Sequence, residues 1–314
     1  MSLPPVSISP SPLPQNSDKL TVLPLSDLHL PKPSAQIIGQ NHAYLDRMDY
    51  VVLLGDMVRC YATDAEYEAV REFIGGLARP YTPVSGNHEW YFEEFDEDSG
   101  IYGEIWAEAS DSEQRASLRK FQGFYGVDTL WRSYQSPLGH FVFLSLDRVE
   151  VSKQECLSDA QLEFLRQEIE RAGEKPLFIW CHAPLMLSCR LDMVYYDDTR
   201  TACVELGENL RAALETRSAP TFWMSGHIHL HPDHYLFPPY QCSGPAPEDG
   251  RGGVWQIHCP DSWGYGRWLR TQNIPAAYEG LFSRHLEIDA HGVTFVTHDH
   301  IQQKDTAQFR VDFK

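Results

Sequence analysis

The sequence is poor in basic residues. It has 26 Lys and Arg against 44 Asp and Glu, which gives a formal net charge of −18 at pH 7. Loose binding to DNA, RNA or anionic membranes needs clustered Lys and Arg that neutralise phosphates, so this charge opposes such binding. A nucleic-acid polymer is therefore an unlikely partner on charge grounds, although a local basic pocket is still permitted.

Cysteine motifs and long apolar runs are also missing. The seven cysteines are an odd number without a CxxC pair, which disfavours a cysteine zinc site and favours free thiols in a reducing compartment. The first 17 residues lack the basic and apolar regions of a signal peptide. No run approaches the roughly 20 apolar residues of a membrane span. The sequence thus predicts a cytoplasmic protein with no membrane partner.

The N-terminus is rich in proline. Residues 1–17, "MSLPPVSISPSPLPQNS", contain five prolines, which favour an extended arm. We expect this arm to pack on its own domain or on a neighbouring subunit, so a homo-oligomer formed through the arm is a hypothesis. Residues 18–314 show no internal repeat and no low-complexity boundary, and we interpret them as a single domain that strands within 252–299 complete.

Short apolar runs alternate with helical patterns after the arm. In the segment 158–173, Ser158 is an expected N-cap, Gln161 stands at the capping-box position and Gly173 ends the helix. The alternation predicts an α/β layered core to which hairpins add antiparallel strands. The expected strands are 19–29, 49–56, 79–89, 176–184, 220–229 and 252–259, the expected hairpins are 131–147 and 284–299, and the expected helices are 64–77, 103–122, 158–173 and 204–217.

Metal-binding residue types follow five of these apolar runs. In open α/β sheets the loops beyond the carboxyl ends of strands converge on ligands. One Asp or Asn at such a position often does no more than end a strand, but five separate runs that each deliver Asp, Asn or His are hard to explain by chance. The residues are Asp27, His29, Asp56, Asn87, His88, His182, His227 and His229.

The chemistry of these side chains suits metals. Carboxylate, amide oxygen and imidazole are donors for Mn, Fe or Zn. The Asp-x-His and His-x-His spacings would place two donors on the same side of an extended segment. Eight donors exceed one ordinary site, whereas seven fit two metal ions that share one carboxylate, with His88 left over. Two metals about 3.5–4 Å apart are the usual arrangement for displacement at phosphorus.

The order D-x-H, G-D, G-N-H-E, H-x-P and G-H-x-H within residues 21–229 resembles the calcineurin-like metallophosphoesterase superfamily. The resemblance implies a four-layer α/β/β/α sandwich with two central mixed sheets and a dinuclear metal site at the strand ends. It also implies in-line attack by a metal-bridging hydroxide, with His88 as proton donor or transition-state stabiliser. The ligands implied for the first metal are Asp27, His29, Asp56 and His229. Those implied for the second are Asp56, Asn87, His182 and His227.

Departures from family patterns narrow the expected substrate. Asp56 is followed by "MVRC" and His182 stands in "CHAP", neither of which is a block of protein Ser/Thr phosphatases. Arg59 occupies the place of the metal-binding tyrosine of purple acid phosphatases. The blocks look more similar to the cyclic-nucleotide phosphodiesterase branch, which favours a small phosphodiester over a phosphomonoester. A pyrophosphatase and a catalytically inactive interaction module remain as alternatives.

Three further residues are candidates for substrate contacts. The Arg59 guanidinium could bind a phosphate or form a surface ion pair. His231 continues the alternation after His229. His258 lies in the aromatic-rich segment 254–268, which could stack on a substrate ring or form a small separate core. The long insert 186–203 is a second candidate cap over the site.

Overall fold

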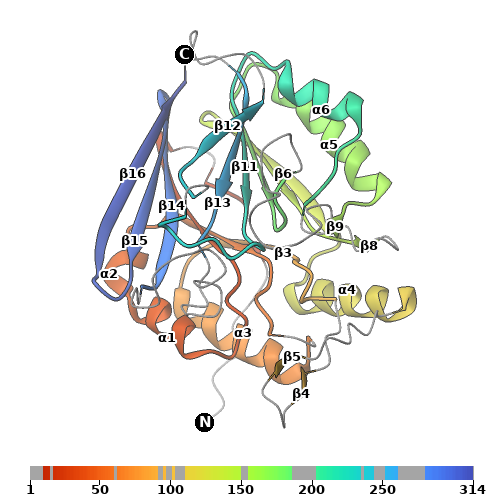
Figure 1. Ribbon diagram of the computed structural model, residues 1–314, viewed down its shortest axis with the longest axis vertical. Helices are drawn as coiled ribbons and strands as arrows, with labels where there is room; N and C mark the ends of the chain where they lie inside the picture. Colours follow the sequence, from red (N-terminus) through yellow and green to blue (C-terminus); the bar gives the residue numbers. More distant parts are fainter. Residues whose placement is uncertain are drawn as a thin grey trace.

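Two six-stranded mixed sheets lie at the centre of the computed structural model (Figure 1). The structure describes residues 10–14, 17–59, 62–90, 95–96, 101–102, 110–149, 155–185, 203–234, 237–243, 252–260 and 280–313. Two short ribbons lie outside the sheets, formed by β4 (Phe95–Asp96) with β5 (Ile101–Tyr102) and by β8 (Arg148–Val149) with β9 (Glu155–Cys156).

The first sheet has the strand order β16-β15-β14-β1-β2-β3. Its parallel half consists of β1 (Lys19–Leu25), β2 (Tyr50–Leu54) and β3 (Tyr81–Val84). Its antiparallel half consists of β14 (Phe282–Asp289), β15 (Gly292–Asp299) and β16 (Lys304–Asp312). β1 joins the halves by pairing antiparallel with β14.

The second sheet has the order β12-β13-β11-β10-β7-β6. Four central strands run parallel, namely β7 (Gly139–Leu144), β10 (Leu177–Cys181), β11 (Thr221–Ser225) and β13 (Val254–His258). Antiparallel strands form both edges, namely β6 (Trp131–Ser136) and β12 (Tyr240–Ser243). β6 and β7 are the hairpin that the sequence predicts.

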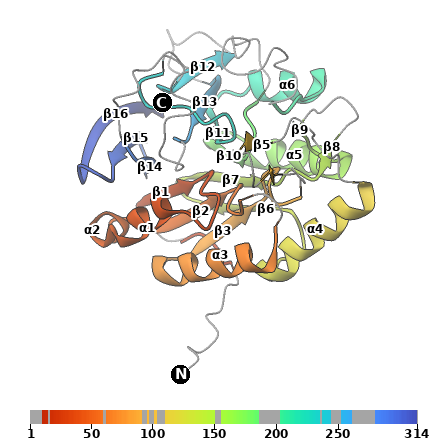
Figure 2. The same ribbon diagram turned by 60° about the horizontal axis from the view of Figure 1, so that its bottom comes forward.

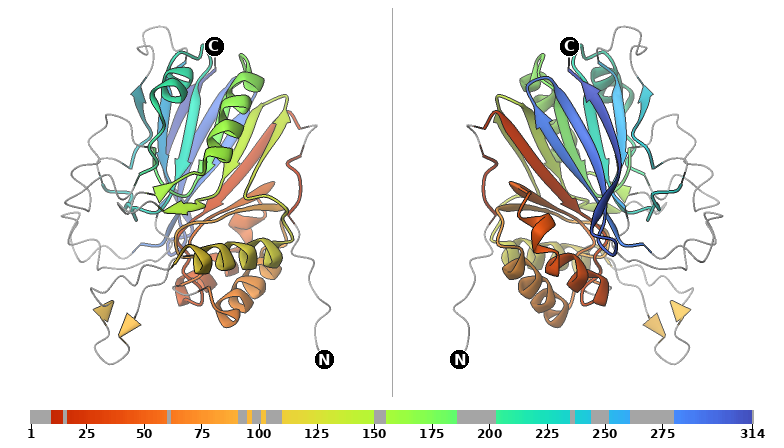
Figure 3. Two further views of the ribbon diagram at one scale, coloured as in Figure 1. Left: turned by 90° about the vertical axis from the view of Figure 1, so that its right-hand side faces the viewer. Right: turned by 90° about the vertical axis from the view of Figure 1, so that its left-hand side faces the viewer.

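Helices flank the pair of sheets. Figures 2 and 3 show α3 and α4 outside the first sheet, and α5 and α6 beyond the second. The helices are α1 (Pro33–Gln40), α2 (His42–Leu45), α3 (Asp64–Leu77), α4 (Asp111–Tyr125), α5 (Asp159–Ala172) and α6 (Glu208–Glu215). α4, the longest, has 15 residues, and among the described residues no helix has the length and apolar character needed to cross a membrane.

Strand alternation builds three apolar cores between these four layers. In β1, Val22 points into the core between the sheets, whereas Leu23 points into the core under the first group of helices. In β10, Phe178 joins the core between the sheets and Ile179 joins the core under α5 and α6. Successive side chains of a strand point to opposite faces, so apolar strands bury both faces of each sheet. The predicted sandwich with two central mixed sheets is confirmed.

The predicted helix 64–77 matches α3 at both ends. The Thr63 hydroxyl accepts the Glu66 N–H at 3.2 Å, and the Glu66 carboxylate accepts the Thr63 N–H at 2.7 Å, so a capping box starts the helix. Tyr67, Val70 and Ile74 are buried at helical spacing, as the periodicity predicts.

The capping box predicted for α5 is wrong. Ser158 is the N-cap residue, but its side chain bonds to Asp147. Gln161 is fully buried and bonds to Ser145: it accepts the Ser145 N–H at 3.1 Å and donates to the Ser145 carbonyl at 2.6 Å. A side chain with both a donor and an acceptor satisfies both backbone groups of one buried loop residue, which sequence spacing does not reveal.

Other boundaries also differ from the predictions. α6 begins at Glu208 instead of 204, because Val204 forms a β-bridge with Leu185. α4 begins at Asp111, and most of the predicted N-terminal part of this helix lies outside the described residues. The sequence patterns did not predict α1, α2, β12, β16 or the four short strands β4, β5, β8 and β9.

Part of the N-terminal arm packs on its own chain. The Ser11 N–H donates to the Tyr81 carbonyl at 3.0 Å, at the edge strand β3. Leu13 is buried in the core between the sheets. Residues 10–14 therefore contact the body of the molecule, whereas residues 1–9, 15 and 16 lie outside the described residues.

Candidate metal centre

The metal-binding residue types follow the carboxyl ends of five parallel strands. Asp27 and His29 follow β1, Asp56 follows β2, and Asn87 and His88 follow β3 in the first sheet. In the second sheet, His182 follows β10, and His227 and His229 follow β11. The loops of the two sheets meet, because the His227 N–H donates to the Asp27 carboxylate at 3.1 Å and His182 Nδ1 lies 2.8 Å from the Leu54 carbonyl of β2.

The backbone at these residues is not extended. β1 ends at Leu25 and β11 at Ser225, so the Asp-x-His and His-x-His spacings fall beyond the strands and the predicted strand alternation does not apply to them. Five of the predicted ligands have positive φ, a region that non-glycine residues rarely occupy. Such strain tends to gather at functional sites. The five are Asp27, His29, Asp56, His227 and His229, with φ of 57°, 45°, 53°, 67° and 49°.

Three groups of side chains bring potential ligand atoms within 4.8 Å of one another. Two of them correspond to the predicted metals. They are Asp27 with His29 and His229, and Asp56 with His182 and His227. The third group is Asp56 with His29 and His88. The structure thus brings the six predicted aspartate and histidine ligands together, and it places His88 beside two of them, Asp56 and His29.

Asp56 lies where a shared ligand is needed. One of its carboxylate oxygens, Oδ2, is 3.0 Å from His182 Nε2 and 3.8 Å from His88 Nε2. The other, Oδ1, accepts the His88 backbone N–H at 2.9 Å. The side chain is 1% exposed, so both its orientation and its burial suit a carboxylate between two cations.

Hydrogen bonds orient two of the imidazoles. His182 Nδ1 lies 2.8 Å from the Leu54 carbonyl, and His88 Nδ1 lies 2.5 Å from the Arg59 carbonyl. A carbonyl accepts only, so each Nδ1 carries a proton and each Nε2 faces Asp56. Backbone partners of this kind fix the tautomer of metal-binding histidines.

Asn87 provides a test of whether the residues fit a metal. Its Oδ1 atom is buried and has no hydrogen-bond partner within the described part of the chain. A buried acceptor without a partner costs about 1–3 kcal/mol. A cation at this position would satisfy the atom, so the amide fits the second metal that the family pattern assigns to it.

The titration behaviour of the groups also suits metal binding. Burial would raise the pKa of Asp56, but His182 and His88 hold it well below its usual range. Burial, with a contribution from His182, lowers the pKa of His227 to about 3. Burial also lowers the pKa of His29. An ionised carboxylate and neutral imidazoles are the forms that bind metals.

Two opposing effects act on the pKa of His182. Burial lowers its pKa, but the carboxylates of Asp56 and Asp27 raise it, and the balance leaves the pKa at about 10. The two carboxylates therefore favour a positive charge between them. A metal ion bound at Nε2 would supply that charge in place of the proton.

The sequence reading quoted Glu89 in "GNHE" but gave it no role. Glu89 is 1% exposed, and its carboxylate accepts three backbone N–H groups, from Asp56 at 3.0 Å, Met57 at 2.8 Å and Gly86 at 2.6 Å. Burial and the nearby Asp56 raise its pKa. Glu89 thus ties the loop after β2 to the loop after β3. The only sign in the sequence of this supporting role is that Glu89 directly follows Asn87 and His88.

Two glycines permit the close approach of these loops. A Cβ atom on Gly86 would lie 2.2 Å from Asp56 Oδ1, and one on Gly226 would lie 1.9 Å from Ser26 Oγ and 2.4 Å from Asp27 Oδ2. Real Cβ atoms do not approach so closely, so any larger residue at Gly226 would displace the Asp27 carboxylate.

The three residues predicted to contact the substrate have different surroundings. The Arg59 carbonyl holds His88, as described above. His231 Nδ1 accepts the Asp233 N–H at 3.1 Å, and its ring packs edge-on against Phe282 at 5.5 Å. His258 is buried at the end of β13, 3.3 Å from Ser225 Oγ. Within the described chain, none of the three groups of ligand atoms includes His231 or His258.

The two predicted caps lie largely outside the described residues. The structure describes only Cys203 of the insert 186–203, and only residues 254–260 of the aromatic-rich segment 254–268. The described part of the second segment is β13, which forms an inner strand of the second sheet.

Comparisons with known proteins agree with the fold. Residues 20–231 match the calcineurin-like phosphoesterase family. A purple acid phosphatase from yellow lupin seeds (Lupinus luteus) has a similar structure, with a TM-score of 0.59 and 16% identity over 97% of this chain and 55% of that one. This chain therefore spans about half the length of the lupin enzyme. No curated protein matches by sequence.

Two other solved structures share the fold. PhoD has a TM-score of 0.57 and 11% identity, over 96% of this chain and 73% of that one. GAP50, the anchor in the inner membrane complex of Plasmodium, has a TM-score of 0.53 and 13% identity, over 94% of this chain and 89% of that one. At such identities the likeness concerns the fold alone. Because the family match spans more than half of the residues, this chain belongs to the calcineurin-like phosphoesterase family.

Proposed function

We propose that this protein hydrolyses small phosphoric esters, with phosphodiesters preferred, at a centre of two metal ions. The observation that carries the proposal is the meeting of the residues after five parallel strands, with the Asp56 carboxylate lying between both groups of histidines. The preference for diesters rests on the "GNHE" and "CHAP" blocks, which resemble the cyclic-nucleotide phosphodiesterase branch.

The side chains of both sheets would hold the metals. Asp27, His29 and His229 would bind one ion, His182, His227 and Asn87 the other, and Asp56 would bind both. Ions in such a centre polarise the phosphoryl group and activate water. The donors suit Mn, Fe or Zn.

His88 would donate a proton to the leaving group. Its side chain is 20% exposed, whereas those of Asp56 and His182 are 1% and 0% exposed, so it is the more accessible to a substrate. With Nδ1 committed to the Arg59 carbonyl, Nε2 is the atom that can carry a proton toward the departing oxygen. The arrangement favours substrates whose leaving group needs protonation.

The test compares turnover of bis(4-nitrophenyl) phosphate and 4-nitrophenyl phosphate by the full chain loaded with Mn, with a chelator-treated sample as control. We expect both activities to require metal and the diester to be hydrolysed faster. Faster turnover of the monoester would contradict the preference for diesters and leave the metal-dependent mechanism standing.

The same samples separate the alternatives. Turnover of inorganic pyrophosphate or a nucleoside diphosphate at a higher kcat/KM than either aryl ester would favour a pyrophosphatase. Metal-loaded protein that is inactive on all of these substrates would favour an interaction module with the phosphoesterase fold.

A further inference from the structure

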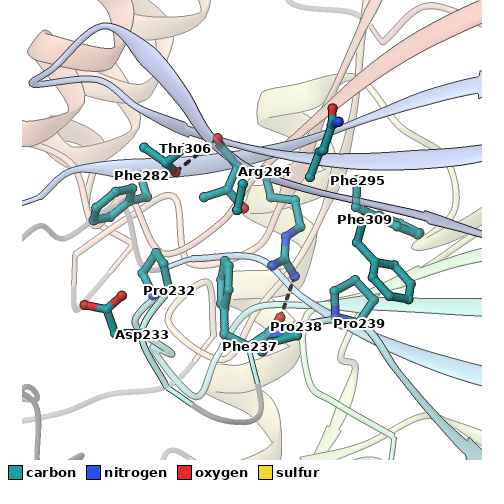
Figure 4. A pocket seen from close by; sticks show the side chains of 13 residues that line it. Pro232, Asp233, Phe237, Pro238, Pro239, Phe282, Arg284, Phe295, Thr306 and Phe309 are labelled. Carbon is teal, nitrogen blue, oxygen red and sulfur yellow. Dashed lines mark hydrogen bonds between the residues drawn. The ribbon is translucent and has the colours of Figure 1, made fainter.

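A cavity is lined in part by the segment that follows the last metal-binding histidines. It has a volume of about 450 Å³, within the usual range of ligand pockets. After His229 the chain continues into one wall of this cavity, at Pro232, Phe237 and Pro238. β14, β15 and β16 form the opposite wall (Figure 4).

The walls are mainly apolar, with four phenylalanines and three prolines among the thirteen lining residues, but they contain one buried cation. Phe282 and Arg284 of β14, Phe295 of β15 and Phe309 of β16 line the cavity. Arg284 stands in the same inward-facing row of β14 as Leu286, which lies in the core between the sheets. A charged residue thus occupies a position where the strand pattern calls for an apolar one.

The guanidinium of Arg284 lacks an anionic partner. Arg284 is 3% exposed, and among the described residues no carboxylate forms an ion pair with it. Nη1 donates to the carbonyls of Phe237 at 2.8 Å and His258 at 2.9 Å. The guanidinium also stacks on the Phe237 ring, 3.6 Å from its centroid. Burying a charge without a counter-charge is costly, so an anion bound in the cavity would stabilise this guanidinium.

The Nε and Nη2 edge of the guanidinium indicates the kind of ligand that would bind. Both hydrogen bonds of Arg284 come from Nη1, and Nε is buried with no hydrogen-bond partner in the described chain. The Nε and Nη2 groups present two parallel N–H bonds, which match the two oxygens of a carboxylate. Burial lowers the pKa of Arg284 to about 9. Because this value is still above neutral pH, the guanidinium is charged there.

We propose that this cavity binds a small organic monocarboxylate with an aromatic or branched apolar body. The carboxylate pairs with the Nε and Nη2 edge of Arg284, and the body packs among Phe282, Phe295 and Phe309. One guanidinium that already serves two carbonyls matches a single negative charge better than a phosphate dianion. Asp233 at the rim, with a side chain 55% exposed, also opposes a second negative charge.

The test measures binding of 4-fluorobenzoate by fluorine-19 NMR to the full chain after chelator treatment. Removing metals matters because a carboxylate would also bind the metal centre. We expect 4-fluorobenzoate to bind about tenfold to a hundredfold more tightly than the neutral 4-fluorobenzamide, the factor for a charge-assisted hydrogen bond. Acetate, which has the charge without the apolar body, should compete poorly.

Two variants locate the binding site. Arg284→Met should lose the preference for carboxylate over amide. Because a buried substitution can impair folding, Ala307→Trp provides a second test: Ala307 is exposed on β16 and lines the cavity, so the indole should fill it and abolish binding. Gln302→Trp, in the exposed turn before β16 and outside the cavity lining, is the matched control and should bind normally.

Several results would overturn the proposal. They are equal binding of acid and amide, binding that Ala307→Trp leaves unchanged, and binding that appears only in metal-loaded protein. A wild-type dimer that Ala307→Trp converts to a monomer, without binding of the acid, would show that a second copy of the chain covers this surface instead.

Discussion

At the scale of residues, the candidate centre combines strained backbone with side chains held by the backbone of neighbouring loops. His88 lies near both Asp56 and His29, and its Nδ1 atom is held by the Arg59 carbonyl. The proposed role as a proton donor predicts a different metal content on substitution than a role as a metal ligand would.

The substitution His88→Ala should keep both metal ions and lose about a hundredfold or more in turnover of an alkyl phosphodiester, the usual contribution of a general acid. Turnover of an aryl ester with a good leaving group should fall much less, because that group needs no proton. Kinetics on both esters and metal analysis of the same sample check this. Loss of one metal ion would identify His88 as a ligand instead.

The substitution Gly226→Ala should displace Asp27, because the added methyl group would lie 2.4 Å from its carboxylate. We expect at least one metal ion to be lost, and turnover with it. Gly76→Ala is the matched control, since no atom lies within 4 Å of a Cβ at that position of α3. It should keep full metal content and gain about 0.5–1 kcal/mol in stability. Metal analysis and urea unfolding check both variants.

At the scale of elements, buried hydrogen bonds between a helix side chain and a loop backbone hold α5 against the second sheet. Gln161→Ala should lower the free energy of unfolding by about 2–4 kcal/mol, because the buried N–H and carbonyl of Ser145 would both lose their partner. Gln167→Ala, on the exposed side of the same helix, should change it by less than about 0.5 kcal/mol. Urea unfolding compares them, and equal effects would contradict a specific role for Gln161.

A buried polar network joins α2 to β14 and β15. The Asn41 amide lies 3.1 Å from His298 Nε2 and 3.3 Å from His300 Nδ1. From His300 the network continues through Ser283 to the Tyr44 hydroxyl and on to His285. Burial lowers the pKa of all three histidines, to about 3 for His300 and about 4 for His285.

This network should make the fold sensitive to acid. An unfolded histidine titrates near 6.5, so the network's contribution is present above that pH and is lost as the pH falls toward the folded values of 3 to 4. For metal-free protein, His300→Gln should remove up to about 2 kcal/mol of the stability difference between pH 7 and pH 5. His42→Gln, at an exposed position of α2, is the control. An unchanged pH dependence in His300→Gln would contradict this.

Helices and strands with a buried apolar face could be predicted from the sequence, whereas exposed or short ones could not. α3 was predicted to the residue because its apolar spacing and its cap agree. β16 was missed because eight of its nine residues are exposed, so backbone pairing with β15 holds it at the sheet edge and leaves no apolar alternation to read. α1 was missed because it is short and buries only Ala35 and Ile38. Short or exposed elements depend on contacts with other elements, which the apolar periodicity of the sequence does not reveal.

At the scale of the whole molecule, the candidate centre belongs to both sheets at once. Asp27, Asp56 and Asn87 come from loops of the first sheet, whereas His182 and His227 come from loops of the second. The residue types and their places after the strands were readable from sequence. Their strained conformations, the support from Glu89 and the cavity at Arg284 were not, because each arises only when the two sheets pack together.

The most direct test of a shared two-metal centre is a count of bound Mn ions in wild-type protein and in Asp56→Ala, by titration calorimetry on chelator-treated samples. We predict two ions per wild-type chain and a marked weakening of both sites in Asp56→Ala, since its carboxylate would contact both ions. One ion or none in the wild type, or two ions bound equally well without Asp56, would contradict the centre proposed for this protein.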